Sequence, residues 1–268
     1  MSPTRIAYQQ LPAAIRHRIS EIVGLVTDAD SAIEGLNSSV AARLHTAGGH
    51  SFVKALPVDH RWAWTQQREA EIAPHVDAVG AGLIARIVDD GWDVLLFDAL
   101  DGHQADYSPG SNDLVPVARL IARIGELPCP HTPLRLAEQR LAAYTSADML
   151  HHFAGDSLLH TDLNPANVIV DNGQARIVDW GWATRGAAWL DAAYWVSWLI
   201  AAGHTPEQAE WWAAQVPAWQ TVTTAGVTAF AEANARLWAE IGAGSTDAWT
   251  TRILAASAAW RQYRQVGV

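Results

Sequence analysis

LLHTDLNPANVIVDNGQARIVDWG, residues 158–181, places polar side chains around a predicted β-hairpin. Two apolar runs flank Asn172-Gly173, and an Asn-Gly pair between such runs is a strong signal for a tight turn. Because a hairpin brings its two ends side by side, we expect Asn167, which enters it, and Asp179, which leaves it, to be neighbours. Oxygen-bearing side chains are the ligands that hard cations such as Mg²⁺ prefer. The stretch therefore predicts a magnesium site formed by Asn167 and Asp179.

The loop before the hairpin adds a candidate base. Asp162 lies one loop turn before Asn167, so its carboxylate can face the same site and accept a proton from a hydroxyl nucleophile. A metal on the phosphates and a base on the acceptor are what phosphoryl transfer needs. The spacing from His160 to Asn167 equals that of the protein-kinase pattern H-R-D-L-x-x-x-N, and 179–181 reads D-W-G where protein kinases have D-F-G. The combined pattern predicts a kinase.

These motifs resemble those of the aminoglycoside phosphotransferase-like kinases, a family of antibiotic kinases and of kinases for choline, homoserine and fructosamine. Thr161 in place of arginine and the form VDWG are similar to that family, and Gly181 to Asp191 leaves no room for an activation loop. The resemblance covers nearly the whole chain. It implies an α+β, bilobal protein-kinase-like fold. A small β-rich N-lobe with one main helix would precede a larger, mostly helical C-lobe that contains the catalytic hairpin.

The resemblance also implies a lysine on the third strand that contacts the nucleotide phosphates. Lys54 ends a β-like run and is the only lysine among 18 basic residues, the others being arginines. A glutamate on the next helix would hold it. Glu69 is favoured by the resemblance, whereas Glu71 faces another way on the helix, and the sequence alone does not choose between them.

Nucleotide contacts are expected at two further places in the N-lobe. The loop over the phosphates is expected at 35–39, where Ser38 and Ser39, with backbone N–H groups, would bind phosphate oxygens. The purine of ATP or GTP would bond to main-chain groups from Asp98 to Leu100, after the strand that ends at Phe97.

The motifs also suggest roles for other polar residues near the catalytic loop. His160 is expected to hold the loop by hydrogen bonds, and Asp191 resembles a family aspartate that packs back on it. A zinc site formed by His151, His152 and His160 is not expected, since adjacent histidines point in different directions. Arg185 is either a phosphate or substrate contact or an ordinary surface arginine.

The acceptor pocket implied by the resemblance lies roughly within 185–265. Trp211 and Trp212 could form a wall of it, although most of the 14 tryptophans are expected to pack helices together. Candidate carboxylates for a cationic acceptor are Glu207, Glu210, Glu232, Glu240 and Asp247. We expect an antibiotic as acceptor, an aminoglycoside or another natural product. A primary-metabolite kinase of the choline, homoserine or fructosamine type, and a non-catalytic nucleotide-binding pseudokinase, are alternatives.

Apolar periodicity predicts the elements around these motifs. The N-lobe is expected at 1–97, a hinge at 98–110 and the C-lobe at 111–268. Helices are expected at 11–23, at 61–79 with Asp59 as its cap, and from Ser111 to Gly125. The expected strands of the N-lobe are 39–46, 51–56, 84–88 and 93–97.

Composition excludes other classes. The chain has 268 residues, 50% of them hydrophobic and 17% charged, which excludes a disordered protein. No apolar run reaches the roughly 20 residues that span a bilayer, and no signal pattern opens the chain. One cysteine excludes an internal disulfide, and a formal charge of −10 disfavours nucleic acid as a partner. We expect a cytoplasmic monomer or homodimer, without membrane or nucleic-acid partners, that binds a small hydroxyl substrate, for which a cationic molecule is one candidate.

Overall fold

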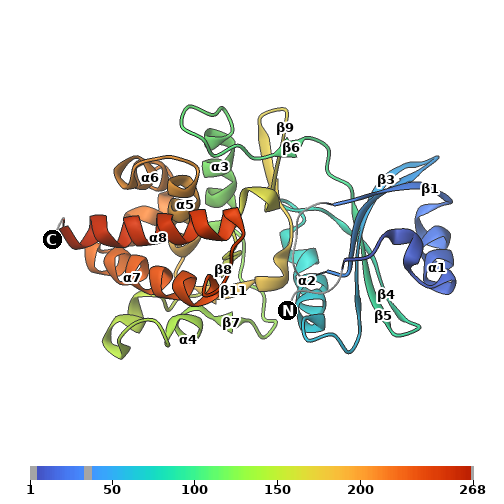
Figure 1. Cartoon of the computed structure of the whole chain (residues 1–268), viewed down its shortest axis with the longest axis horizontal. Coiled ribbons are helices and arrows are strands. Elements are labelled where there is room, and N and C mark those ends of the chain that lie inside the picture. Colours follow the sequence, from blue (N-terminus) through green and yellow to red (C-terminus); the bar gives the residue numbers. More distant parts are fainter. Residues whose placement is uncertain (1–4, 33–37, 267–268) are drawn as a thin grey trace. The chain divides into compact units, whose positions relative to one another are not determined.

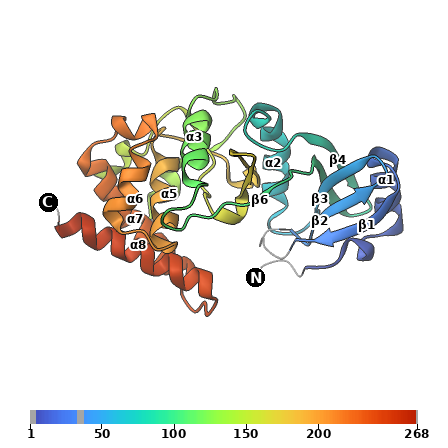
Figure 2. The ribbon, with the colours of Figure 1, turned by 90° about the horizontal axis from the view of Figure 1, so that it is seen from above.

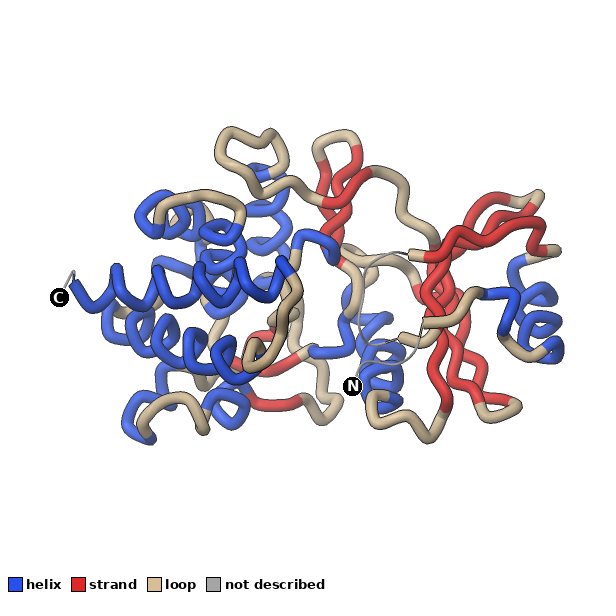
Figure 3. The backbone as a smooth tube through the Cα atoms, in the orientation of Figure 1, coloured by secondary structure: helices blue, strands red, loops and turns tan. Residues whose placement is uncertain are grey.

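The computed structural model describes residues 5–32 and 38–266, and the chain divides into two compact units. The first unit comprises Met1–Asp101 together with Ile177–Trp182, and the second comprises Gly102–Arg176 and Ala183–Val268. Long strands dominate the first unit and helices the second (Figure 3). The expected α+β fold class is therefore confirmed.

The first unit is built on an antiparallel sheet with the strand order β1-β2-β3-β5-β4 (Figure 2). Its strands are β1 (Val26–Ser31), β2 (Val40–Thr46), β3 (Gly49–Pro57), β4 (Leu83–Asp89) and β5 (Trp92–Asp98). The four predicted strands are confirmed with small shifts at their ends. The sequence analysis missed β1, whose residues VTDADS lack apolar alternation because this edge strand is mostly exposed.

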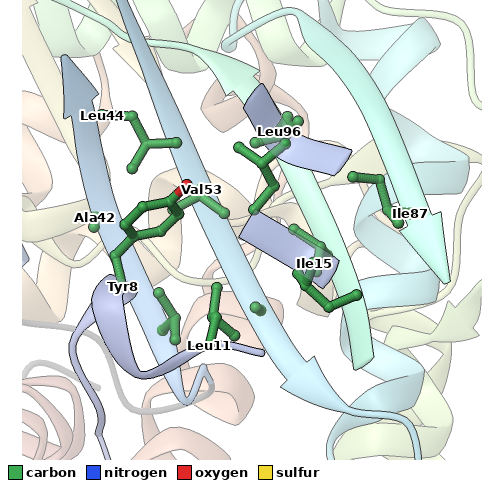
Figure 4. Packing of buried hydrophobic residues seen from close by; sticks show 12 residues of the cluster. Tyr8, Leu11, Ile15, Ala42, Leu44, Val53, Ile87 and Leu96 are labelled. Atoms are coloured by element: carbon green, nitrogen blue, oxygen red, sulfur yellow. The ribbon is translucent and has the colours of Figure 1, made fainter. Parts of the chain in front are cut away.

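One face of this sheet packs against α1 (Ala13–Val23). Ile15 of the helix and Val53 and Leu96 of the sheet are completely buried in this core (Figure 4). The helix ends at Gly24, which has a φ of 90°, as its position after the apolar pattern predicts. A short 3-10 helix, η1 (Tyr8–Gln10), extends the same core.

The other face of the sheet packs against α2 (Ala63–Val76), where Ala73 contacts a small core with Leu95 and Phe97. Successive side chains of a strand point to opposite faces. Lys54, which follows Val53 in β3, is therefore on the side of α2. This alternation puts the lysine on the face that the glutamates of α2 can reach.

The start of α2 differs from the expectation. Asp59 does not cap the helix; Trp62 is the N-cap residue, and it makes no side-chain capping bond. Residues 58–62 form turns instead, in which the backbone N–H of Trp62 donates to His60 Nδ1 at 3.2 Å. Residues 61 and 62, which were predicted to begin the helix, therefore belong to these turns.

The second unit is mainly helical (Figure 1). Its longer helices are α3 (Leu114–Gly125), α5 (Leu190–Ala201), α6 (Pro206–Ala213), α7 (Thr224–Ile241) and α8 (Ala248–Val266). α5 packs against α6 and α8, and α7 packs against α8. Thr205 and Gln208 form a capping box at the start of α6. α3 begins at Leu114 rather than Ser111, whose hydroxyl accepts the N–H of Asp113.

Two small sheets lie among these helices. One has the order β10-β9-β6, with β6 (His103–Gln104), β9 (Val168–Asp171) and β10 (Gln174–Ile177). The predicted hairpin is confirmed, and its turn residues Asn172 and Gly173 have φ values of 48° and 73°. The other sheet, β7-β11-β8, was not predicted, because β7 (Arg135–Leu136), β8 (Ser157–Leu159) and β11 (Thr184–Gly186) are too short to show a pattern.

The remaining elements are short. They are α4 (Ala137–Leu141) and the 3-10 helices η2 (Ala147–His152), η3 (Pro165–Asn167), η4 (Trp180–Trp182) and η5 (Pro217–Thr221). Several tryptophans of the second unit pack helices as expected: Trp195 and Trp260 are completely buried, whereas Trp211 is 58% exposed. Within residues 5–32 and 38–266, no helix combines the length and hydrophobicity of a membrane span.

Candidate functional site

The first unit holds a lysine between two carboxylates. Lys54 Nζ donates to Glu69 Oε1 at 2.8 Å and to Oε2 at 3.0 Å. Asp179 Oδ1 lies 3.2 Å from the same nitrogen. Lys54 and Glu69 are only 8% and 5% exposed. One ammonium group thus faces two carboxylates in a poorly hydrated place, where charges interact strongly.

The charges around Lys54 keep it protonated. Burial by itself lowers the pKa of Lys54, but the carboxylates of Asp179 and Glu69 raise it by more, so the pKa lies above its usual value. The open choice between the two glutamates is decided by the geometry. Glu71 points elsewhere on α2, where its carboxylate accepts a hydrogen bond from Gln67 at 2.9 Å.

Asp179 is held next to α2 by its neighbours in the chain. It has a φ of 68°, a left-handed conformation that aspartate tolerates better than most residues. The following Gly181 packs directly on α2: a Cβ there would lie 3.0 Å from the Cβ of Thr65. Trp182 adds an aromatic contact, with its ring 5.5 Å from that of Trp62. A side chain at 181 would therefore fit only if Thr65 shifted slightly.

The second unit holds the catalytic-loop residues. His160 and Thr161 follow β8, and their backbone N–H groups donate to Asp191 Oδ2 at 2.9 Å and Oδ1 at 2.8 Å. Asp191 is buried near the start of α5, and burial raises its pKa to about 6 although the two N–H donors and Arg140 lower it. The role given to Asp191 by the resemblance thus has a geometric basis: its carboxylate anchors the loop.

His160 supports the candidate base from the other side. Its Nδ1 accepts the backbone N–H of Asp162 at 3.2 Å, and its ring is completely buried. Asn167 Nδ2 donates to the carboxylate of Asp162 at 2.9 Å and to its backbone carbonyl at 3.2 Å. Asp162 is therefore oriented by both neighbours that the motif predicts.

Asn167 of the second unit and Asp179 of the first each have an oxygen donor of the kind that magnesium prefers. Because the amide nitrogen of Asn167 is bonded to Asp162, its oxygen is the group left to face a cation. Asp179 has a quarter of its side chain exposed and offers a second carboxylate oxygen beside the one near Lys54. Mg²⁺ usually takes one or two such protein ligands, with waters and phosphates as the rest. Accordingly, the described residues show no cluster of three or more His, Cys, Asp or Glu for a metal.

The structure describes only part of the expected phosphate loop at 35–39. Residues 35–37 of the expected phosphate loop lie outside the described residues. Ser38 and Ser39 are described, but the N–H of Ser39 donates to the carbonyl of Ala55 at 2.9 Å. This N–H is thus occupied in this structure by the backbone of β3, because Ser39 directly precedes β2, and the phosphate contact of Ser38 and Ser39 remains a prediction.

Groups of the expected purine contact are also engaged within the first unit. The N–H of Asp98 donates to Gly82 O at 2.9 Å, since Asp98 is the last residue of β5. The carbonyl of Leu100 accepts from Arg43 Nη1 at 3.0 Å. These two groups are thus occupied in this structure, and the purine contact remains a prediction for the rest of the segment.

Other candidates make ordinary protein contacts. Arg185 pairs with Asp156 on the surface, through a 3.0 Å bond from its Nε. The rings of His151 and His152 are in contact at a tilt of 38°, with centroids 3.9 Å apart, so the two side chains do not point in different directions as expected. Most of the proposed acidic acceptor contacts have partners within the second unit: Glu210 with Trp260 and Arg264, Glu232 with Arg236, Glu240 with Tyr144, and Asp247 with Thr250.

Two residues near the loop were missed by the sequence analysis. Arg140 Nη1 donates to Thr161 Oγ1 at 2.7 Å and to Thr184 Oγ1 at 2.5 Å. Tyr107 is buried, interacts electrostatically with Asp162, and its hydroxyl has no hydrogen-bond partner within the described residues. Neither stands in a motif, and only the tertiary structure brings them to the loop.

Comparisons with known proteins agree with this geometry. The model of the phosphotransferase enzyme family matches residues 126–238, which include the catalytic loop, the hairpin and Asp191. Over these residues the chain is similar to the phosphotransferase enzyme family. No curated protein matches the sequence.

Solved structures of the same fold include choline kinase LicA from Streptococcus pneumoniae, with a TM-score of 0.63, 12% identity, and coverage of 93% of this chain and 98% of that one. They also include a thermostable mutant of aminoglycoside phosphotransferase APH(4)-Ia in ternary complex with AMP-PNP and hygromycin B. That likeness has a TM-score of 0.62 and 16% identity, and covers 92% of this chain and 99% of that one. The chain thus has the fold of choline kinase and of aminoglycoside phosphotransferases, and its residues 126–238 resemble a family of phosphotransferases.

Proposed function

We propose that this kinase transfers the γ-phosphate of ATP or GTP, in a magnesium-dependent reaction, to a hydroxyl group of a small cationic molecule. The observation that carries the proposal is the buried Lys54, held by Glu69 and lying 3.2 Å from Asp179. The Lys54 ammonium and the two carboxylates together carry a net negative charge, which suits a magnesium ion bound to the nucleotide. The lysine itself suits the phosphates.

The residues of the two units have complementary roles in this reaction. Lys54 contacts the nucleotide phosphates, and Glu69 keeps it in place. Asp162 accepts the proton of the acceptor hydroxyl while the hydroxyl oxygen forms a bond to the γ-phosphorus. The bond from that phosphorus to the oxygen shared with the β-phosphate breaks, and the nucleoside diphosphate leaves. No covalent phospho-enzyme is required.

Asn167 and Asp179 would hold the magnesium ion. When bound, the ion offsets negative charge on the phosphates during transfer. His160 and Asp191 do not touch the reacting atoms; they hold the backbone on which Asp162 is presented.

We propose an antibiotic, an aminoglycoside or another natural product, as the acceptor. Support comes from the likeness to APH(4)-Ia, whose ternary complex contains hygromycin B. A choline-type metabolic kinase is the second candidate, since choline kinase LicA resembles the chain equally well. Both acceptor classes join a hydroxyl group to a nearby positive charge.

A nucleotide-consumption assay tests this function. ATP or GTP with Mg²⁺ is combined with a panel of aminoglycosides, other natural-product antibiotics, choline, homoserine and sugar amines. Asp162→Asn is the blank, and Asp171→Asn, an exposed carboxylate at the hairpin turn, is the matched control. Turnover with one class that only Asp162→Asn loses would support the proposal and identify the class. Nucleotide binding without turnover on any compound would favour a non-catalytic nucleotide-binding protein.

A further inference from the structure

Thr161 stands in an unfavourable backbone conformation between two functional neighbours. Its φ is 68°, in the left-handed region that β-branched residues seldom occupy. It lies between His160 and Asp162, so its conformation decides where the candidate base points. Such a conformation persists only where surrounding contacts hold it.

Asp191 and Arg140 both hold Thr161. Asp191 accepts its backbone N–H at 2.8 Å, and Arg140 donates to its side-chain oxygen at 2.7 Å. The same nitrogen of Arg140 donates to Thr184 Oγ1 at 2.5 Å. Thr184 lies in β11 opposite Leu159, the residue that leads into the catalytic loop from β8. Arg140 therefore links the loop to the strand beside it.

The loop motif has threonine at the position where protein kinases have arginine. Here a guanidinium group reaches that position from α4, about 20 residues earlier in the chain. Both threonines are buried, with exposures of 7% and 0%, so a hydroxyl left without its donor would not be compensated by bulk water.

We propose that Arg140 is a positioning residue for catalysis, which holds Thr161 in its left-handed conformation and thereby presents Asp162 to the acceptor hydroxyl. The inference rests on the proposed role of Asp162. It predicts an effect on the rate of transfer and little effect on nucleotide binding, because Lys54, Glu69 and Asp179 belong to the other unit.

The test compares Arg140→Met, Thr161→Val and the double variant, using Mg-ATP and the most active acceptor of the panel. We expect each single change to lower kcat at least tenfold while the KM for ATP stays within twofold. The double variant should be no slower than the slower single variant, because both changes remove the same contact. Arg140→Lys should recover part of the rate, since lysine can donate to both hydroxyl groups.

Controls separate this inference from general damage. Arg236→Met removes another arginine with two bonds in the second unit and should leave kcat unchanged. If Arg140→Met does not fold, Thr184→Val removes only one of the two bonds and replaces it in the test, with a smaller loss of kcat expected. A kcat of Arg140→Met within twofold of wild type, or effects that multiply in the double variant, would overturn the proposal.

Failure of the proposed function gives a different result. Full turnover in Asp162→Asn would remove the base assignment, whatever Arg140 does. The coupling between Arg140 and Thr161 in urea unfolding would still report whether the guanidinium holds the loop. Additive effects of the two substitutions on unfolding would show that it does not.

Discussion

The carboxylate of Asp191 accepts the backbone N–H of Thr161 at 2.8 Å, although the two residues are 30 positions apart in the chain. Together with the bond from the N–H of His160, this makes a buried carboxylate the support of the catalytic loop. Asp191 must be ionised for each carboxylate oxygen to accept one N–H, yet its burial opposes that ionisation. This conflict gives the protein a predictable dependence on pH.

Activity and the stability contribution of Asp191 should change in opposite directions with pH. Its pKa is raised from 3.8 to about 6 in the folded protein, so the folded state binds the proton more tightly than the unfolded chain. The raised pKa adds about 3 kcal/mol to the free energy of unfolding below pH 3.8. This contribution is lost as the pH rises through about 6. Activity should fall below about pH 6, because protonation weakens the anchor of the loop.

The pH dependence assigned to Asp191 can be tested by urea unfolding and rate measurements from pH 4 to 8, with wild type and Asp191→Asn. The variant should lose rate at neutral pH by about tenfold or more, since an amide nitrogen would face a backbone N–H. Its free energy of unfolding should vary less between pH 4 and 6. An unchanged pH dependence in the variant would contradict the assignment.

Glu69→Gln should weaken nucleotide binding and lower stability. The change leaves a buried lysine with one charged partner fewer, which costs about 3 kcal/mol in unfolding experiments. We expect the Kd for Mg-ATP to rise about tenfold in a calorimetric titration. Glu71→Gln is the matched control on the same helix, because Glu71 pairs with Gln67 and Arg68 of α2 rather than with Lys54. Equal effects of the two substitutions would show that Lys54 does not depend on Glu69.

Asp162→Asn and Asp179→Ala should impair different steps, the first the rate of transfer and the second the binding of Mg-ATP. The first should keep its affinity for Mg-ATP and lose rate by about 10²–10⁴-fold, as expected for removal of a general base. The second should bind Mg-ATP more weakly, because it removes an oxygen ligand. Titration with Mg-ATP and single-turnover kinetics distinguish the two. An Asp162→Asn variant that turns over at the wild-type rate would exclude this residue as the base.

Gly181→Ala should destabilise the first unit. The added Cβ would lie 3.0 Å from the Cβ of Thr65, so α2 would have to shift, at a cost of about 1–3 kcal/mol. Since α2 carries Glu69, the KM for ATP should rise as well. Gly125→Ala is the control, because a Cβ there meets nothing within 4 Å. Thermal unfolding of both variants provides the measurement, and an unchanged Tm for Gly181→Ala would contradict the close approach.

Tyr107→Phe should raise the free energy of unfolding by about 1 kcal/mol. The hydroxyl is buried without a partner in the described part of the chain, and removing such a group relieves its desolvation cost. Tyr144→Phe, which removes an exposed hydroxyl bonded to Glu240 at 3.0 Å, should have little effect or a small destabilising one. Urea unfolding measures the free energy of unfolding of both variants. A clear destabilisation by Tyr107→Phe would reveal a partner for its hydroxyl.

Local sequence determined a large part of this protein. The Asn-Gly turn, the Gly24 helix end, the capping box of α6 and four strands of the first sheet could be predicted, because each depends on neighbours in the chain. The spacing from His160 to Asn167 predicted the catalytic loop for the same reason. Errors arose where local signals were weak: the exposed edge strand β1, the short strands of the second unit and the start of α2.

Only the tertiary structure decided the contacts between distant residues. The choice of Glu69 over Glu71 depends on which turn of α2 faces β3, and the role of Ser39 depends on where the sheet begins. Asp191 and Arg140 hold the loop through bonds that link residues 21 to 31 positions apart. Periodicity and turn chemistry act over a few residues, whereas these contacts depend on how whole elements pack, and no single stretch of the sequence carries that information.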